Sequence, residues 1–337
     1  MSHPPRNARC RWLFVAACLV CGLLLQCPPA RAYTCSASSP GTQSLGNVSP
    51  VSGLAYSTSG TITVTCTVAP AEGLLAGTHI IACLSIGGAS GSSPRTLVNG
   101  ANSLQYNLYS DSAHTQIIGS AAAAPPNPVA VDFNLGLLGI LLGGTSSQSV
   151  SLYTSMPSGQ TSLQAGNYSQ SFSGGNAAVN YTAYTGTTPT CSAAWTSGGS
   201  FPFTVSATVI NDCNITATNI DFGASGVLGV ALSANGTLTA QCTSGDSYSI
   251  ALNRGATAGA SLNDRLMSTG GGSVVHYQLY TAASYTTIWG DGTSGTSTVG
   301  STGSGATQSY TVFGSVAAQT TPAPGSYSDT ITATITY

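Results

Sequence analysis

The two halves of this chain carry the same short motifs in the same order. The paired segments are STSGTITVTC at 57–66 with SANGTLTAQC at 233–242, LQYNLY at 104–109 with VHYQLY at 275–280, and GNYSQ at 166–170 with GSYSD at 325–329. Arg95 and Arg265 precede the two tyrosine motifs at similar distances. Order and spacing together indicate one fold that occurs twice, and residues 33–337 suffice for two domains of about 150 residues.

Each half consists of short runs rich in Thr, Val, Ile and Tyr, separated by turns rich in Gly, Ser, Asn and Pro. This pattern is typical of a β-sandwich, and residues that favour helices are scarce. The sequence therefore predicts an all-β protein made of two tandem sandwiches.

The first 32 residues are expected to be a signal peptide, because a basic start is followed by an apolar run at Trp12–Leu25 and a small-x-small site at Ala30–Ala32. The Gly-, Ser- and Thr-rich stretch Thr187–Ser200 is the predicted junction between the domains. We therefore expect a first domain at 33–190 and a second domain at 191–337.

Charge excludes one class of partner. The chain has no lysine, and beyond residue 32 nine carboxylates face three arginines. Such a chain lacks the basic patch that phosphate-backbone binding needs, so no nucleic acid partner is expected. No nucleophile elbow, zinc-protease motif or Walker loop occurs. We expect no enzyme, no cofactor and no metal site.

Asp291 and Asp329 lie in predicted turns, and we expect them to accept backbone N–H groups there. For Arg254 and Arg265 we expect a structural ion pair or a carbonyl cap. His276 is expected to be an outward-facing polar residue of a strand.

Six cysteines follow the signal peptide, three in each half, which suits a disulfide framework in an oxidising compartment. The repeat places Cys35 before Cys66 and Cys213 before Cys242, so we pair them in that way. The remaining two cysteines, Cys83 on an apolar run and Cys191 after the last strand of the first half, form the third expected pair.

The last segment of the chain predicts an open strand edge. Residues 331–337 alternate Ile331, Ala333, Ile335 and Tyr337 with threonines, which is the pattern of a half-buried strand. An unpaired edge invites pairing with another chain, so β-strand addition is the expected use of these four residues. In the first half, the equivalent segment near Tyr168–Tyr184 is followed by more chain that could complete its sheet.

The second half resembles the spore coat protein U domain, which subunits of archaic, Csu-type chaperone–usher pili share. The motifs that carry the resemblance are VSATVINDC at 205–213, IDFG at 220–223, GTLTAQC at 236–242, RLM at 265–267, YQLY at 277–280, IWGDG at 288–292, YTVFG at 310–314 and GSYSDTI at 325–331. The first half matches more loosely and lacks the Phe-Gly and Trp-Gly-Asp-Gly elements.

The resemblance implies pilin-type, immunoglobulin-like sandwiches, the C-terminal one lacking its final strand. A periplasmic chaperone, and later the N-terminal donor strand of the next pilus subunit, would supply that strand, with an outer-membrane usher handling export to the surface of a Gram-negative cell. Only Tyr33 and Thr34 precede Cys35 after the expected cleavage site. We therefore expect a subunit that accepts a strand without donating one, as in a tip adhesin for attachment and biofilm formation.

The expected adhesive element is a leucine-rich loop in the first half. Its residues are Leu135, Leu137, Leu138, Ile140, Leu141 and Leu142. They are more apolar than an ordinary exposed loop and would dock on an unidentified surface or host ligand, although a core strand with a turn is the alternative. Two other interpretations stay open: a glycan- or protein-binding module that uses Tyr56, Tyr106 and Tyr153, and a structural, spore-coat-like component without adhesive function.

Overall fold

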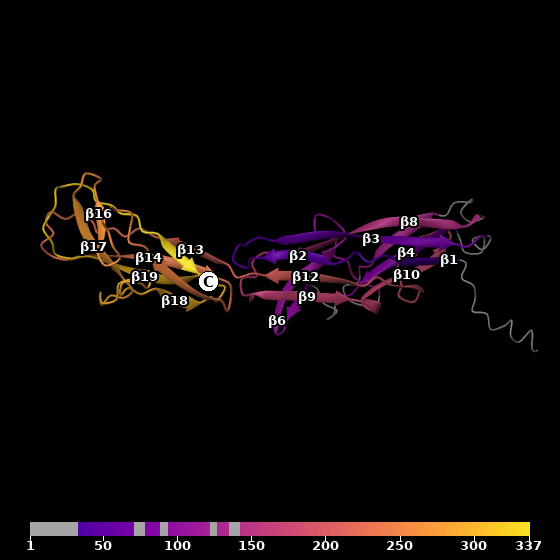
Figure 1. The fold of residues 1–337 in the computed structure, drawn as a ribbon. Coiled ribbons are helices and arrows are strands. Elements are labelled where there is room, and N and C mark those ends of the chain that lie inside the picture. Colours follow the sequence, from indigo (N-terminus) through magenta and orange to yellow (C-terminus); the bar gives the residue numbers. More distant parts are fainter. Residues whose placement is uncertain (1–32, 71–77, 88–93, 122–126, 135–141) are drawn as a thin grey trace, which may run out of the picture.

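The structure is a computed structural model that describes residues 33–70, 78–87, 94–121, 127–134 and 142–337. It is built from β-strands in two sandwiches that lie end to end (Figure 1). The predicted signal peptide at 1–32 lies outside the described residues. The all-β architecture predicted from the motif pattern is confirmed.

Two sheets form the first sandwich. Its strands are β1 (Tyr33–Ala37), β2 (Gln43–Val48), β3 (Tyr56–Val68), β4 (His79–Ile86), β5 (Arg95–Asn99), β6 (Asn102–Tyr109), β7 (Val129–Asn134), β8 (Gly144–Met156), β9 (Gly166–Phe172), β10 (Ala177–Tyr184), β11 (Thr196–Ser200) and β12 (Phe203–Val209), with a 3-10 turn η2 (Gly174–Asn176). The larger sheet has the order β1-β3-β8-β6-β5-β9-β12-β2 and the smaller one β11-β10-β4-β7. Alternate residues of both sheets form one core, as the period-2 pattern requires.

The second sandwich has fewer strands. They are β13 (Cys213–Ala217), β14 (Leu232–Cys242), β15 (Ser247–Leu252), β16 (Arg265–Ser268), β17 (Val274–Tyr280), β18 (Val299–Thr302), β19 (Gln308–Val316) and β20 (Ala333–Thr336). One sheet has the order β13-β14-β19-β17-β16 and the other β18-β15-β20. A separate apolar core lies between them.

The two sandwiches correspond strand by strand. The order β13-β14-β19-β17-β16 repeats β1-β3-β8-β6-β5, and β18-β15-β20 repeats β7-β4-β10. Cys35 faces Cys66 between β1 and β3, as Cys213 faces Cys242 between β13 and β14. The structure contains the three disulfides that the sequence analysis pairs, Cys35–Cys66, Cys83–Cys191 and Cys213–Cys242. Among the described residues, counterparts of β2, β9, β11 and β12 are missing from the second sandwich.

The first sandwich extends further along the chain than predicted. β11 pairs with β10, and β12 pairs with both β9 and β2, so residues 196–209 complete the first fold. Gly198 lies so close to β1 that a Cβ atom there would be 2.2 Å from the Cys35 carbonyl oxygen, which requires glycine at this position. The strand pairing therefore differs from the predicted boundary at 190/191, because the end of the stretch taken as a junction, Thr196–Ser200, is β11 of the smaller sheet.

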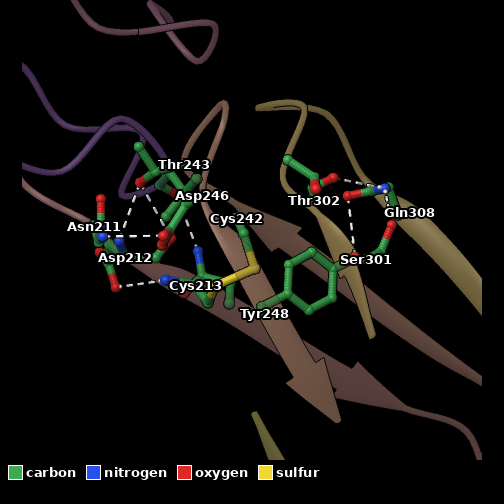
Figure 2. The surroundings of a disulfide bond; sticks show 12 residues. Asn211, Asp212, Cys213, Cys242, Thr243, Asp246, Tyr248, Ser301, Thr302 and Gln308 are labelled. Atoms are coloured by element: carbon green, nitrogen blue, oxygen red, sulfur yellow. Dashed lines mark hydrogen bonds between the residues drawn. A yellow bond between two sulfur atoms is a disulfide. The ribbon is translucent and has the colours of Figure 1, made fainter. Parts of the chain in front are cut away.

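The passage between the sandwiches is short. Only Ile210–Asp212 separate β12 from β13. Figure 2 shows Asn211 and Asp212 of this passage beside the Cys213–Cys242 disulfide. The Asp212 amide donates to Thr243 Oγ1 at 3.0 Å, and Asn211 Nδ2 donates to Asp246 Oδ1 at 3.0 Å. β12, which we call the closing strand of the first sandwich, is thus anchored at its end on the second sandwich.

Candidate functional site

An open groove with a mixed polar and apolar lining runs along the second sandwich. Its volume is about 570 Å³. One wall is the segment that follows β13 and the other is the segment that leads into β20, with the sandwich core as the floor. The lining residues are Ala217, Thr218, Asn219, Ile220, Asp221, Phe222, Thr237, Leu238, Leu252, Met267, Tyr277, Leu279, Val312, Tyr327, Ser328, Asp329, Ile331 and Ala333.

The equivalent place in the first sandwich is filled by β12. This strand runs parallel to β2 on one edge and antiparallel to β9 on the other. Phe203, Val205, Ala207 and Val209 point inward and are buried in the core. The Phe203 ring stacks on Phe172, with ring centroids 4.6 Å apart. The first sandwich thus shows what a complete fold of this type contains.

Corresponding side chains differ in burial between the two sandwiches. Tyr168 and Phe172 of the first sandwich are fully buried. Their repeat counterparts, Tyr327 and Ile331, are only half-buried and border the groove. Both tyrosines make the same hydrogen bond to the carbonyl four residues earlier, so the turn is retained and resembles the tyrosine corner of immunoglobulin-like folds. What the second sandwich lacks is the strand that would cover these side chains.

Backbone pairing shows the same difference. In the first sandwich, residues 166–172 form β9 because β12 supplies a continuous partner. In the second, residues 325–331 form only the isolated Ser268–Ser328 bridge. β10 pairs with both β4 and β11, whereas β20 pairs only with β15 within the described residues. An edge of this kind is a template for another strand.

The four residues predicted as the acceptor edge occupy different places. Ile331 and Ala333 line the groove, and Ile335 packs against the core beside them. Tyr337 is 51% exposed and is not part of the groove lining. The opposite wall contains Ile220 and Phe222, which are half-buried and are not among the predicted edge residues. In the Ile-Asp-Phe-Gly motif, two apolar residues lie two positions apart, which is the spacing that places both side chains on one face of an extended segment. That spacing is the sequence signal for this wall.

Polar groups fix one end of the groove. Asp329 accepts hydrogen bonds from the Ala256 and Thr257 amides at 2.9 and 3.1 Å and from the Tyr277 hydroxyl at 2.6 Å. Burial, followed by the hydrogen bond to Asp329, raises the pKa of Tyr277 well above its ordinary value. Asp329 is therefore a structural acceptor of backbone N–H groups, as the turn motif predicts, and Tyr277 stays protonated to donate to it.

A buried arginine caps carbonyl groups in each sandwich. Arg265 donates to the Asn253 and Trp289 carbonyls at 2.9 and 2.8 Å, and Arg95 donates to those of Ile86 and Ile118 at 2.7 Å each. Burial lowers the pKa of both guanidinium groups. The carbonyl cap expected for Arg265 is present, and its repetition at Arg95 marks it as part of the fold.

The candidate ligand-contacting residues belong to the first half of the sequence. Leu135, Leu137, Leu138, Ile140 and Leu141 lie outside the described residues, whereas Leu142, just before β8, is 71% exposed. Of the three tyrosines considered for a binding module, Tyr106 is completely buried, and its hydroxyl donates to Gln170. The structure therefore excludes Tyr106 as a surface contact, because its strand turns that face toward the core.

Two structural features are absent from the described residues. No helix there has the length and apolarity to cross a membrane. No cluster of three or more His, Cys, Asp or Glu side chains in the described ranges is arranged to hold a metal ion.

Comparison with known proteins gives one family match. The model of the Spore Coat Protein U domain matches residues 23–175 and again 199–334. No curated protein sequence matches the chain.

A solved structure shares the fold. The chaperone–tip adhesion subunit pre-assembly complex from the archaic chaperone–usher Csu pili of Acinetobacter baumannii contains a chain 18% identical to this one, with a TM-score of 0.52; the match covers 90% of this chain and 100% of that one. The CFA/I adhesin CfaE of enterotoxigenic E. coli is 12% identical over 88% of this chain and 92% of that one, with a TM-score of 0.27, too low to support an argument.

Proposed function

The chain belongs to the Spore Coat Protein U domain family, and from that premise we propose that it is a pilus subunit whose second sandwich takes up a strand from a partner protein. One observation carries the proposal: the slot that β12 fills in the first sandwich is an open groove in the second. The partner would be a periplasmic chaperone before assembly and the donor strand of the next subunit in the fibre, delivered through an outer-membrane usher to the cell surface.

The first sandwich supplies the geometry of the incoming strand. By analogy with β12, the donor runs parallel to residues 219–223 and antiparallel to residues 325–331, with apolar side chains at alternate positions. Four buried side chains of this kind contribute roughly 1.5–3 kcal/mol each. Part of this free energy offsets the cost of ordering the donor strand, but enough remains to explain why assembly would depend on the groove.

We further propose that the chain is the tip adhesin, in which the first sandwich presents the ligand-contacting surface. In the described part of the first sandwich, residues 196–209 of the chain itself occupy the position that is an open groove in the second. The solved neighbour with the same two-sandwich fold is described as a tip adhesion subunit in complex with its chaperone. The leucine-rich loop is the proposed contact. Replacing Leu138 and Ile140 by serine should abolish surface attachment and biofilm formation while fibres still assemble, whereas misfolding would assign this loop to the core.

The strand-acceptor proposal is tested by hydrogen exchange on the full chain. We expect backbone amides of β15 and residues 325–336 to exchange far faster than those of β4 and β10 in the free chain. A synthetic peptide with the sequence of Phe201–Ile210, or co-expression with a periplasmic pilus chaperone, should slow exchange in the second sandwich, and Phe222→Asp should remove the effect. A free chain that is a stable monomer with equal protection in both sandwiches would refute the proposal.

A further inference from the structure

A further repeated motif has its first copy where the two sandwiches meet. SPVSGLA at 49–55 precedes β3, and SGVLGVA at 225–231 precedes β14 in the same position. The two segments share a serine, a valine two residues later, and a Gly-(Leu/Val)-Ala ending. The duplication therefore provides two copies of one loop, of which only the first has a neighbouring domain beyond it (Figure 1).

The first copy is an interface loop. Ser49 Oγ donates to Asp212 Oδ2 at 2.5 Å, and Asn214 Nδ2 donates to the Val51 carbonyl at 3.0 Å. Asp212 and Asn214 flank Cys213, the first cysteine of the second sandwich. Val51 is only 6% exposed although it belongs to neither apolar core. Its carbonyl is bonded to Asn214, so this part of the loop lies against the second sandwich.

The second copy has the same groups without that neighbour. Val227, the counterpart of Val51, is 68% exposed, and Val230 is also 68% exposed. Ser225, the counterpart of Ser49, donates instead to the carbonyl of Val227 within its own loop, at 2.7 Å. In the first copy, the serine hydroxyl and the valine carbonyl bind Asp212 and Asn214 of the second sandwich. In the second copy, the corresponding hydroxyl and carbonyl are bonded to each other.

The loop before β9, at 161–165, also has a counterpart in the second sandwich, and again only the first copy contacts a neighbouring sandwich. In the first sandwich, Gln164 forms a bridge with Ser244, and a Cβ atom at Gly305 would lie 2.0 Å from the Thr161 carbonyl oxygen. This loop, just before β9, therefore also touches the second sandwich closely. Its counterpart before Gly325 is 320–324, which is held to the Val227 loop because the Leu228 amide donates to Thr321 Oγ1 at 2.9 Å.

We infer that loops 225–230 and 320–324 form a docking surface for the body of the next pilus subunit, distinct from the groove that takes its donor strand. In the first sandwich the closing strand leads within three residues to the sandwich that covers the equivalent loops. A donor strand in the groove would run in the same direction and deliver its own sandwich to 225–230. The occupant is therefore another Spore Coat Protein U sandwich, presenting the residues around its first cysteine.

Docking would exchange hydrogen bonds rather than create unpaired groups. Ser225 Oγ would turn from the Val227 carbonyl to a carboxylate before the partner's first cysteine, as Ser49 does toward Asp212. The freed Val227 carbonyl would accept from a side chain after that cysteine, as Val51 does from Asn214. Val227 and Val230 would lose their exposure.

This inference depends on the proposed strand uptake, so its test separates the two. The full chain would be expressed in cells that assemble the fibre, with a photo-crosslinking residue at Val227, at Ile331 in the groove, or at exposed Val98 in the first sandwich as the control. We expect Ile331 to capture the donor strand of a Spore Coat Protein U subunit. Val227 should capture the same subunit at a peptide containing its first cysteine, at least tenfold above Val98.

Two outcomes would overturn the docking surface and leave strand uptake intact. In the first, Ile331 captures a partner but Val227 captures no more than the control. In the second, Val227 captures the partner at a peptide other than the one that contains its first cysteine. No capture at Ile331 would overturn the proposed function and the inference with it. In the same cells, Val227→Asp should lower the fraction of chain in fibres about tenfold, because it puts a carboxylate against the partner's carboxylate. Ala283→Asp, at an exposed turn of the same sandwich, should leave that fraction unchanged, and equal effects of the two substitutions would count against the docking surface.

Discussion

The strongest quantitative prediction concerns Phe203 in the closing strand of the first sandwich. This side chain is buried, stacks on Phe172 and lies near Phe201. Replacing a buried phenylalanine by alanine costs about 3–5 kcal/mol. At about 1.4 kcal/mol for each factor of ten, Phe203→Ala should speed the exchange of β2 and β9 amides, measured by mass spectrometry, by roughly two to three and a half orders of magnitude.

The matched control is Thr204→Ala, one residue further along the same strand. Thr204 faces outward and shares only an exposed hydroxyl contact with Ser171, at 3.2 Å, so its loss should change exchange by less than about threefold. If both substitutions have the same small effect, β12 does not close the first sandwich. The comparison between the slot that β12 fills in the first sandwich and the open groove of the second would then fail as well.

Three further outcomes are expected. Replacing Cys83 and Cys191 by alanine removes a link with a sequence separation of 108 and should cost the first sandwich up to about 4.8 kcal/mol on the loop-entropy estimate; a denaturant midpoint that does not move would contradict this. Arg265→Lys loses the guanidinium fork that caps two carbonyls and should destabilise the second sandwich by about 2–3 kcal/mol, seen as faster exchange in β17, whereas unchanged exchange would refute the structural assignment. Hydrogen bonds from the Thr293 side chain and amide lower the pKa of Asp291 from its ordinary value. Its contribution to stability is therefore present above the pKa of the unfolded chain and is lost as the pH falls through the lower native pKa. NMR titration of the carboxyl group checks the direction, and Asp291→Asn should remove this part of the pH dependence.

The duplication made most of the fold predictable, because the same motifs lie on corresponding strands in both halves. The pairs Cys35–Cys66 and Cys213–Cys242 follow from the same comparison, since Cys35 and Cys213 lie at equivalent positions of β1 and β13. Cys83 and Cys191 have no counterparts in the repeat and were paired as the two cysteines that remained. Tyr106 was misassigned although the information was present: alternation places it on the same face of β6 as Leu104 and Leu108, which are core residues.

The domain boundary was harder to predict from the sequence. The alternation of Phe203–Val209 shows a strand with one apolar face, but periodicity does not say which sheet that strand joins. Proximity to Cys213 favours the second sandwich, whereas hydrogen bonding assigns the strand to the first. The far wall of the groove was missed for a related reason: Ile220 and Phe222 belong to no strand of the structure, so strand patterns give them no weight.

The closing strand also determines how the molecule carries tension. A pull on the second sandwich reaches the first through Ile210–Asp212 and then along the axis of β12. Hydrogen bonds on both edges of that strand are then loaded in shear, so they resist together instead of opening one after another. If β11 and β12 were nevertheless extracted, the Cys83–Cys191 disulfide would stop the unravelling at residue 191. The first sandwich would lose its closing strand but would stay covalently tethered to the body of β4 under load.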